Sequence, residues 1–374
     1  MVANIILGVI CLLFIFIIPD KKKALKVVFF ITTFFLSIRY MWGNDYPEYL
    51  GYFNFFNGYS FGLFDITSSG EIYKRNEFGW VILNRLFGSI GFGFFGLVIV
   101  LSIFENWIMY RVISKHVDPK YYWVAIFFYI FSTSFAVNAS MMRQYFCICL
   151  YMLVVDLMID KNVRGYLWWS IGLILFGTCF HTTNIVMILT LPFFFINFNS
   201  SKIPYIWMIV IAVGFLLWNL LGYSLMDSTI AMIMRNSDEY SSYEAYLEME
   251  NAGANSGLGM IFRYVMFIVW LLLLPQFEEK DKQAIIILGL ISYFLDVAVA
   301  VVPLATRFQA YFTILDMVRW AWLVQVARKH PLLYVLFVAQ IAITARVFYG
   351  FYYSEVWTDL TFQYQTIFSA GEWM

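Results

Sequence analysis

The chain contains 374 residues, of which 62% are hydrophobic and 13% are charged. Water-soluble proteins carry about 25% charged residues, so this composition excludes a soluble enzyme, a disordered tail and a disulfide scaffold. The 24 basic and 24 acidic side chains cancel, and the net charge therefore indicates neither a nucleic-acid partner nor an anionic one. We expect an all-α polytopic membrane protein that binds no nucleic acid.

Apolar stretches recur along the whole chain at the length that crosses a bilayer. A hydrocarbon core of about 30 Å requires about 20 residues of α-helix. About twelve spans are predicted on this basis, at residues 2–18, 24–41, 91–110, 121–137, 141–159, 165–182, 184–198, 203–222, 259–277, 283–302, 308–327 and 332–349. No internal repeat or soluble domain is visible in the sequence, so residues 1–374 are predicted to form a single integral-membrane domain.

The distribution of lysine and arginine predicts the orientation of these spans, because short cytoplasmic connections carry the positive excess. Basic residues gather in alternate connections: Lys21 to Lys23 with Lys26; Arg111, Lys115 and Lys120; Lys161 and Arg164; Lys202; Lys280 and Lys282; and Arg328 with Lys329. Both termini are therefore predicted to be extracytoplasmic. The long loops 42–90 and 223–258 and the tail 350–374 are predicted to form one polar extracytoplasmic surface, rich in Tyr, Asn, Ser and acidic residues.

A set of arginines lies within a turn or two of the predicted outer ends of the spans. These are Arg39, Arg143, Arg263, Arg307 and Arg346. Ionisable residues at membrane depth are costly, which makes them candidates for a functional site. The alternative is that each arginine extends to the interface or pairs with an acid. A guanidinium also binds phosphate oxygens bidentately, so the set predicts a phosphate site at the outer face.

Histidine is rare in this chain, and one of the three lies at the same predicted level. His181 ends a span on the outer side, whereas His116 and His330 lie in basic cytoplasmic connections and are expected to be solvated. An imidazole titrates near neutral pH, so His181 is a candidate proton acceptor for a hydroxyl group. The alternative is a capping or packed residue at the helix end.

The first outer loop carries acidic residues at both of its ends. Asp45 and Glu48 follow Arg39 closely, and an interfacial belt of Tyr and Trp does not explain these carboxylates. Near the other end, residues 76–87 carry apolar positions at helical spacing, which predicts an amphipathic helix in the interface. Glu77 would lie in its first turn, either complementing the helix dipole or facing the site.

Other charged residues lie inside the predicted bundle. Asp316 and Arg319 share one helix face at i and i+3, so they are expected to neutralise each other. Asp296 and Glu105 have no partner that the sequence reveals.

Several short motifs resemble those of the EpsG-like, Wzy-type family of bacterial polysaccharide polymerases. They are Gly43-Asn44-Asp45-Tyr46 after Arg39; Glu77-Phe78-Gly79; Asn138 with Met142-Arg143-Gln144; Phe180-His181-Thr182-Thr183; and Thr306-Arg307-Phe308 with Tyr311-Phe312. Their order covers most of the chain from Arg39 to Phe312. The chain departs from the family in having Gly43-Asn44 where a pair such as Gly-Thr is common.

The resemblance implies a GT-C-like helical bundle in the bacterial inner membrane that acts as a glycosyltransferase. Such enzymes transfer a glycan chain from undecaprenyl diphosphate to a lipid-linked repeat unit at the outer face, and a chain-length regulator is a possible partner. Guanidinium groups would stabilise the leaving diphosphate without a metal ion or other cofactor. The implied diphosphate ligands are Arg39, Arg143, Arg307 and Gln144, with Arg263, Arg346 and Tyr311 as additional candidates. The acceptor hydroxyl needs a base, for which His181, Asp45 and Glu77 are candidates.

Two other functions remain open at the level of sequence. An O-antigen ligase uses the same donor and a similar outer site but transfers the glycan to lipid A core. A lipid-linked oligosaccharide flippase, or another transporter, also has about a dozen helices and buried cations. A flippase should carry cations along a cavity that reaches both faces and often shows two related halves, whereas the helix-end arginines here gather on one predicted face.

Overall fold

The structure is a computed structural model that describes residues 1–58, 76–159, 163–195, 205–235, 258–277, 280–301, 305–353 and 364–368. Nearly all of the described backbone is helical, and the all-α prediction is confirmed. The chain divides into two compact units. Unit 1 contains Met1–Leu157, Gly165–Ile188 and Trp320–Met374, and unit 2 contains Met158–Arg164 and Leu189–Arg319.

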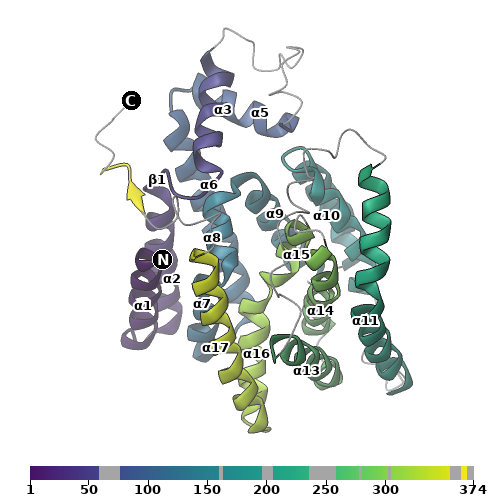
Figure 1. The fold of residues 1–374 in the computed structure, drawn as a ribbon. Coiled ribbons are helices and arrows are strands. Elements are labelled where there is room, and N and C mark those ends of the chain that lie inside the picture. Colours follow the sequence, from purple (N-terminus) through teal and green to yellow (C-terminus); the bar gives the residue numbers. More distant parts are fainter. Residues whose placement is uncertain are drawn as a thin grey trace. The chain divides into compact units, whose positions relative to one another are not determined.

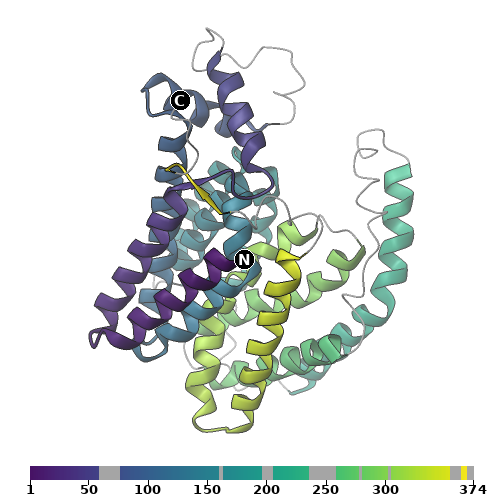
Figure 2. The same cartoon turned by 60° about the vertical axis from the view of Figure 1, so that its left-hand side comes forward.

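Unit 1 is a bundle of helices with one short sheet (Figures 1 and 2). Its α-helices are α1 (Val2–Ile17), α2 (Lys21–Ser37), α3 (Tyr46–Gly58), α5 (Phe78–Ser89), α6 (Gly93–His116), α7 (Tyr122–Phe131), α8 (Thr133–Ser140), nearly all of α9 (Met142–Met158), most of α10 (Val163–Thr178), most of α16 (Asp316–Ala327) and α17 (Leu332–Tyr352). It also contains the 3-10 helix η1 (Pro119–Tyr121) and the start of a second 3-10 helix, η2 (Thr182–Phe195). The strands of the sheet are β1 (Arg39–Tyr40) and β2 (Gln365–Thr366). Helix α1 packs against α2 and α7, α2 packs against α6, and α17 contacts α7 and α8. Helices α3 and α5 contact each other above the end of α6.

Unit 2 is built around α14 (Lys280–Val301), which contacts α11 (Tyr205–Arg235), α13 (Leu258–Leu273) and α15 (Thr306–Thr313). A short 3-10 turn, η4 (Leu274–Gln276), follows α13. Aromatic rings hold three of these helices together. Phe215 of α11 stacks on Phe267 of α13 with ring centroids 3.9 Å apart, and its edge meets Phe294 of α14 at 5.2 Å. The core of this unit is thus an aromatic cluster shared by α11, α13 and α14.

Helical backbone coincides with each of the predicted spans. Two spans are interrupted, because Ser132 separates α7 from α8 and a turn at Ile314 and Leu315 separates α15 from α16. Within the described ranges, the helices that are long and apolar enough to cross a membrane are Gly93–His116, Gly259–Gln276, Lys282–Val299 and Leu332–Tyr352, and shorter apolar helices are Val2–Ile17, Gly165–Thr178, Thr182–Phe195 and Met208–Gly222. The number of crossings and the GT-C-like arrangement therefore stay predictions.

Large apolar side chains cover the outer surfaces of both units. Phe30, Trp168, Leu220 and Val335 are each more exposed than buried, at 63–76% of their full accessible surface. Large apolar side chains this exposed are unfavourable in water but favourable against lipid. The exposed faces therefore agree with helices that are surrounded by acyl chains.

Contacts within unit 1 join helix ends that the predicted alternating topology places on the same side of the membrane. At the predicted outer end, Asn4 of α1 donates a hydrogen bond to the Tyr352 hydroxyl near the end of α17. Strand β1 pairs antiparallel with β2, with Arg39 opposite Thr366, so part of the C-terminal tail lies against the start of the first outer loop. Which end faces the cytoplasm stays a prediction. Most of the loop 223–258 lies outside the described residues.

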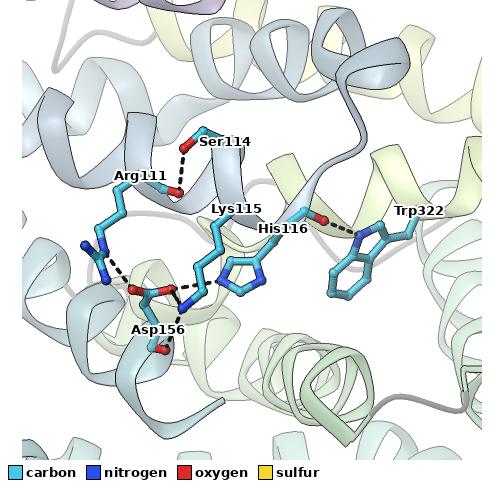
Figure 3. Close-up of polar contacts among 6 residues, drawn as sticks. All are labelled: Arg111, Ser114, Lys115, His116, Asp156 and Trp322. Atoms are coloured by element: carbon cyan, nitrogen blue, oxygen red, sulfur yellow. Dashed lines mark hydrogen bonds and ion pairs between the residues drawn. The ribbon is translucent and has the colours of Figure 1, made fainter. Parts of the chain in front are cut away.

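At the other end of unit 1, one buried carboxylate binds three basic side chains. Asp156 of α9 is 1% exposed and accepts from Arg111 Nε at 2.7 Å, Lys115 Nζ at 2.8 Å and His116 Nε2 at 3.1 Å, all on α6 (Figure 3). The expectation that His116 is solvated is wrong, because its ring packs on Asp156 and its carbonyl accepts from Trp322 Nε1. His330 is exposed as expected.

This cluster fastens the C-terminal ends of α6 and α9 to each other. Replacing Asp156 by Asn would leave its basic partners without an anion, and we expect unfolding to become easier by about 2 kcal/mol, the usual contribution of a charged hydrogen-bonded group. The measurement is the midpoint of thermal unfolding in detergent. The matched control is Asp118→Asn, which removes an exposed carboxylate that caps η1 and leaves an equally good capping oxygen. An equal midpoint in the two variants would contradict the assigned role of Asp156.

Candidate functional site

An ion pair between Arg143 and Glu77 forms the centre of the site in unit 1. Arg143 lies in the first turn of α9, and Glu77 immediately precedes α5. The Nη1 atom of Arg143 donates to Glu77 Oε2 at 2.6 Å and to Asn76 Oδ1 at 3.1 Å. The two charged side chains are 19% and 18% exposed. The pair is therefore shielded from bulk water but still accessible to a ligand.

The second carboxylate oxygen of Glu77 reaches a third segment of the chain. Glu77 Oε1 accepts a hydrogen bond from the backbone N–H of Thr182, at 3.2 Å, where η2 begins. Glu77 occupies the capping position of α5 without making a side-chain capping bond. Of the two roles that the sequence left open, facing the site is the one that the geometry supports, and the carboxylate joins α5, α9 and the start of η2.

Gly79 explains how the segment that carries Glu77 comes so close to the end of α10. Its backbone N–H donates to the carbonyl oxygen of Cys179 at 2.7 Å. A Cβ atom on Gly79 would lie 2.8 Å from that oxygen, closer than real Cβ atoms come. Only glycine therefore lets α5 start against the end of α10. The segment after α10 is held in turn by Asn184, whose Nδ2 donates to Ile174 O at 2.7 Å.

His181 lies next to the residue that binds Glu77. Its ring is buried, with 8% of the residue exposed, and Nδ1 lies 2.7 Å from the Thr183 hydroxyl. Its backbone N–H donates to Gly177 O at 3.0 Å, which closes the end of α10. His181 thus has a packing role at the helix end and directly precedes the residue whose amide binds Glu77.

Tyr49 of α3 covers the guanidinium of Arg143. The guanidinium carbon of Arg143 lies 5.6 Å from the centroid of the Tyr49 ring, within the range of a cation–π contact. Tyr49 is 4% exposed and meets the Trp80 ring edge-on at 5.3 Å. Burial raises the pKa of Tyr49 to about 12, although the Arg143 charge opposes that shift. The phenol is therefore protonated at neutral pH and cannot serve as a base. Tyr52, one turn further on, donates to Glu48.

Asp45 and Gln144 lie near the same end of unit 1. The backbone N–H of Asp45 donates to the Ser140 hydroxyl at 3.4 Å, close to the point where α8 ends and α9 begins. Gly43 makes this approach possible, because its φ of +99° suits glycine and a Cβ atom there would lie 2.8 Å from Ser140 Cα. Asp45 is half-buried, and Gln144 is buried beside Arg143 in the chain.

Arg39 is buried inside unit 1, away from the surface. It has no exposed area, and its Nη1 donates to Leu36 O at 2.6 Å and to the Ser102 hydroxyl at 2.9 Å. The Arg39 carbonyl accepts from the Tyr46 hydroxyl at 3.2 Å. Glu105 lies one turn along α6 from Ser102, is equally buried, and attracts Arg39 electrostatically. Neither Glu105 oxygen has a hydrogen-bond partner among the described residues.

The remaining candidates lie on other elements. In unit 2, Arg263 pairs with Asp296 at 3.1 Å, so the interpretation of Asp296 as unpaired is wrong, while the pairing of Asp316 with Arg319 is confirmed. Arg307 lies in the first turn of α15 and is half-buried, and Tyr311 of the same helix is fully buried. Arg346 is exposed on α17 of unit 1.

The structure thus pairs Arg143 with Glu77 in unit 1, and Glu77 binds the backbone amide of Thr182, the residue after His181. Sequence reasoning missed Asn76, Tyr49 and the Thr182 amide as partners in this site, although all three lie within or next to the quoted motifs. Within the described ranges, no group of three or more His, Cys, Asp and Glu side chains could hold a metal ion. Metal-independent chemistry stays a prediction.

The chain matches a known family. The model of the EpsG family matches residues 22–366, which include every motif quoted from the sequence. No curated protein and no solved structure matches the chain.

The close approach at Gly79 gives a direct test of the site's construction. Gly79→Ala should push α5 away from α10 and lower the unfolding free energy by about 1–3 kcal/mol, as overpacking does in tight cores. The control is Gly51→Ala in α3, where a new Cβ meets nothing within 4 Å and alanine should be neutral or slightly stabilising. Thermal unfolding of both variants in detergent measures the difference. Equal stability would show that α5 does not depend on this contact.

Proposed function

Because the chain belongs to the EpsG family, we propose that it is a bacterial polysaccharide polymerase of the inner membrane. In this proposal it transfers a growing glycan chain from undecaprenyl diphosphate to a lipid-linked repeat unit at the outer membrane face. The observation that carries the proposal is the partly exposed Arg143–Glu77 pair beside His181, at one end of a bundle of apolar helices. A site at a helix end lies where a lipid diphosphate would meet the protein.

Arg143 has the properties that a diphosphate ligand needs. It lies in the first turn of α9, where the helix dipole favours an anion. Partial burial reduces screening, so the guanidinium attracts a phosphate more strongly than an exposed arginine would. When the glycosidic bond breaks, negative charge builds on the diphosphate, and a fixed guanidinium stabilises that charge.

The other site residues keep proposed roles that follow from their surroundings. His181, Asp45 and Glu77 are the candidates for the base that takes the proton of the acceptor hydroxyl. Arg307 and Gln144 are proposed as further diphosphate ligands, with Arg263, Arg346 and Tyr311 as additional contacts. Arg39 would attract the diphosphate through its charge and without direct contact, because its guanidinium donates to Leu36 O and the Ser102 hydroxyl. Catalysis would use no metal ion.

The proposal is tested by the polysaccharide length distribution of a deletion strain. Complementation with the wild-type chain should restore a ladder of long chains, and Arg143→Ala should leave single repeat units at an unchanged protein level. Arg328→Ala is a control, because it removes an exposed arginine in the turn after α16 of unit 1. Long chains in the Arg143→Ala strain would contradict the proposal.

The same strain separates the alternatives. A missing polymerase leaves single repeat units at the cell surface, whereas a missing flippase makes lipid-linked repeat units accumulate on the cytoplasmic side. A deletion that leaves long chains on the lipid carrier, with none attached to lipid A core, would identify a ligase. Either of the latter two results would overturn the polymerase proposal.

An Arg143→Lys variant tests the geometry of the cation as well as its charge. Lysine keeps the charge but loses the planar fork that bridges a carboxylate or phosphate bidentately. We expect chain lengthening to fall at least tenfold, measured as incorporation of labelled repeat units by membranes. Activity within twofold of wild type would mean that a point charge is sufficient.

A further inference from the structure

One atom of Arg143, Nη1, makes the charged contact of the resting structure and is also a donor that a diphosphate can use. Nη1 of Arg143 donates to Glu77 Oε2 at 2.6 Å, a short charge-assisted contact. A diphosphate that binds this guanidinium carries more negative charge than a carboxylate and competes for the same donor. If Arg143 is the diphosphate ligand of the proposed function and binds it through Nη1, the diphosphate displaces Glu77 from Arg143.

The displaced carboxylate would remain within the site. Its other oxygen, Oε1, accepts from the Thr182 N–H at 3.2 Å, and that bond does not involve Arg143. The backbone next to Glu77 is fixed by the Gly79 bond to Cys179 O. One oxygen of Glu77 is thus anchored and the other is exchangeable, so the side chain can release Arg143 without leaving its neighbours.

Other candidate bases in the site are less suitable. The His181 ring is 8% exposed and its Nδ1 already contacts the Thr183 hydroxyl at 2.7 Å. The Tyr49 phenol is protonated and buried. Glu77, with 18% of its side chain exposed, is as accessible as the cation beside it. A carboxylate next to a newly bound diphosphate also holds a proton more tightly than one next to a guanidinium, which suits it to accept one.

We propose that the donor's diphosphate takes the place of Glu77 on Arg143, and that the released Oε2 of Glu77 accepts the proton of the acceptor sugar's hydroxyl. This inference rests on the proposed function. It makes Glu77 a catalytic residue that becomes available only after the donor has bound, so the resting ion pair keeps the base inactive.

The transfer step balances without a further reactant. The acceptor hydroxyl oxygen forms a bond to the anomeric carbon of the donor, and its proton passes to Glu77 Oε2. The bond from that carbon to the diphosphate oxygen breaks, and its electron pair leaves with the diphosphate, whose charge Arg143 stabilises. Glu77 then loses the proton to water and pairs with Arg143 again when undecaprenyl diphosphate departs.

The test separates binding from transfer in the full-length protein, reconstituted in lipid nanodiscs. Binding of undecaprenyl diphosphate and transfer from a lipid-linked donor are measured for wild type, Glu77→Gln and Glu48→Gln. Glutamine keeps the shape and the oxygen that accepts from Thr182, so Glu77→Gln should fold. It should bind undecaprenyl diphosphate at least fivefold more tightly, because the competing anion is gone, and transfer at least 100-fold more slowly, as loss of a general base predicts. Glu48→Gln, an exposed carboxylate on α3, should change neither.

Weaker binding by Glu77→Gln would overturn the inference, because it would mean that Glu77 only holds Arg143 in place. Unchanged transfer would overturn it as well. A charge-swapped double variant, Glu77→Arg with Arg143→Glu, adds a readout that does not depend on the folding of Glu77→Gln. A structural pair would be restored by the swap, and activity with it, whereas the proposed exchange predicts a stable protein with no transfer. If the wild type neither binds undecaprenyl diphosphate nor transfers, the proposed function itself fails.

Discussion

The need to neutralise the largely buried Arg143 determines the construction of the candidate site. An unpaired guanidinium that is largely buried costs several kcal/mol, so its position requires an acceptor of opposite charge. Glu77 supplies that acceptor from a segment 66 residues away. The same carboxylate binds the Thr182 amide, and so one charge interaction holds α5, α9 and the start of η2 together.

The neighbouring contacts serve the same arrangement. Gly79 lets α5 begin against α10, and Tyr49 covers the guanidinium while packing on Trp80. The Asp156 cluster at the other end of unit 1 uses the same chemistry for a different purpose. There the carboxylate is buried under three basic partners, which leaves it no room to exchange, whereas both side chains of the Arg143–Glu77 pair are partly exposed. Accessibility, more than charge, distinguishes the candidate site from a structural clamp.

The sequence predicted features that depend on local spacing. The length of the apolar stretches predicted where the helices lie in the chain. The pairing of Asp316 with Arg319 followed from their positions on one helix face. The helix predicted over residues 76–87 from their periodicity is present as α5, Phe78–Ser89. Such features are set by a few neighbouring residues, so a single chain is sufficient to infer them.

Partners that meet through tertiary packing were not predictable in the same way. Nothing local indicated that Asp156 would bind His116, which lies 40 residues away, or that Asp296 would bind Arg263. The burial of Arg39 was not predictable from the sequence either. Its place at the end of a span suggested an accessible cation, but Ser102 and Glu105 of α6 surround a side chain with no exposed area.

The central claim is that Arg143 exchanges a carboxylate for a diphosphate. A cryo-EM structure of the protein with undecaprenyl diphosphate bound in a nanodisc tests this claim most directly. The account predicts a phosphate oxygen within hydrogen-bond distance of the Arg143 guanidinium, with Glu77 Oε2 moved off Nη1 and Oε1 still bonded to the Thr182 amide. A diphosphate bound elsewhere, with the Arg143–Glu77 contact intact, would contradict it.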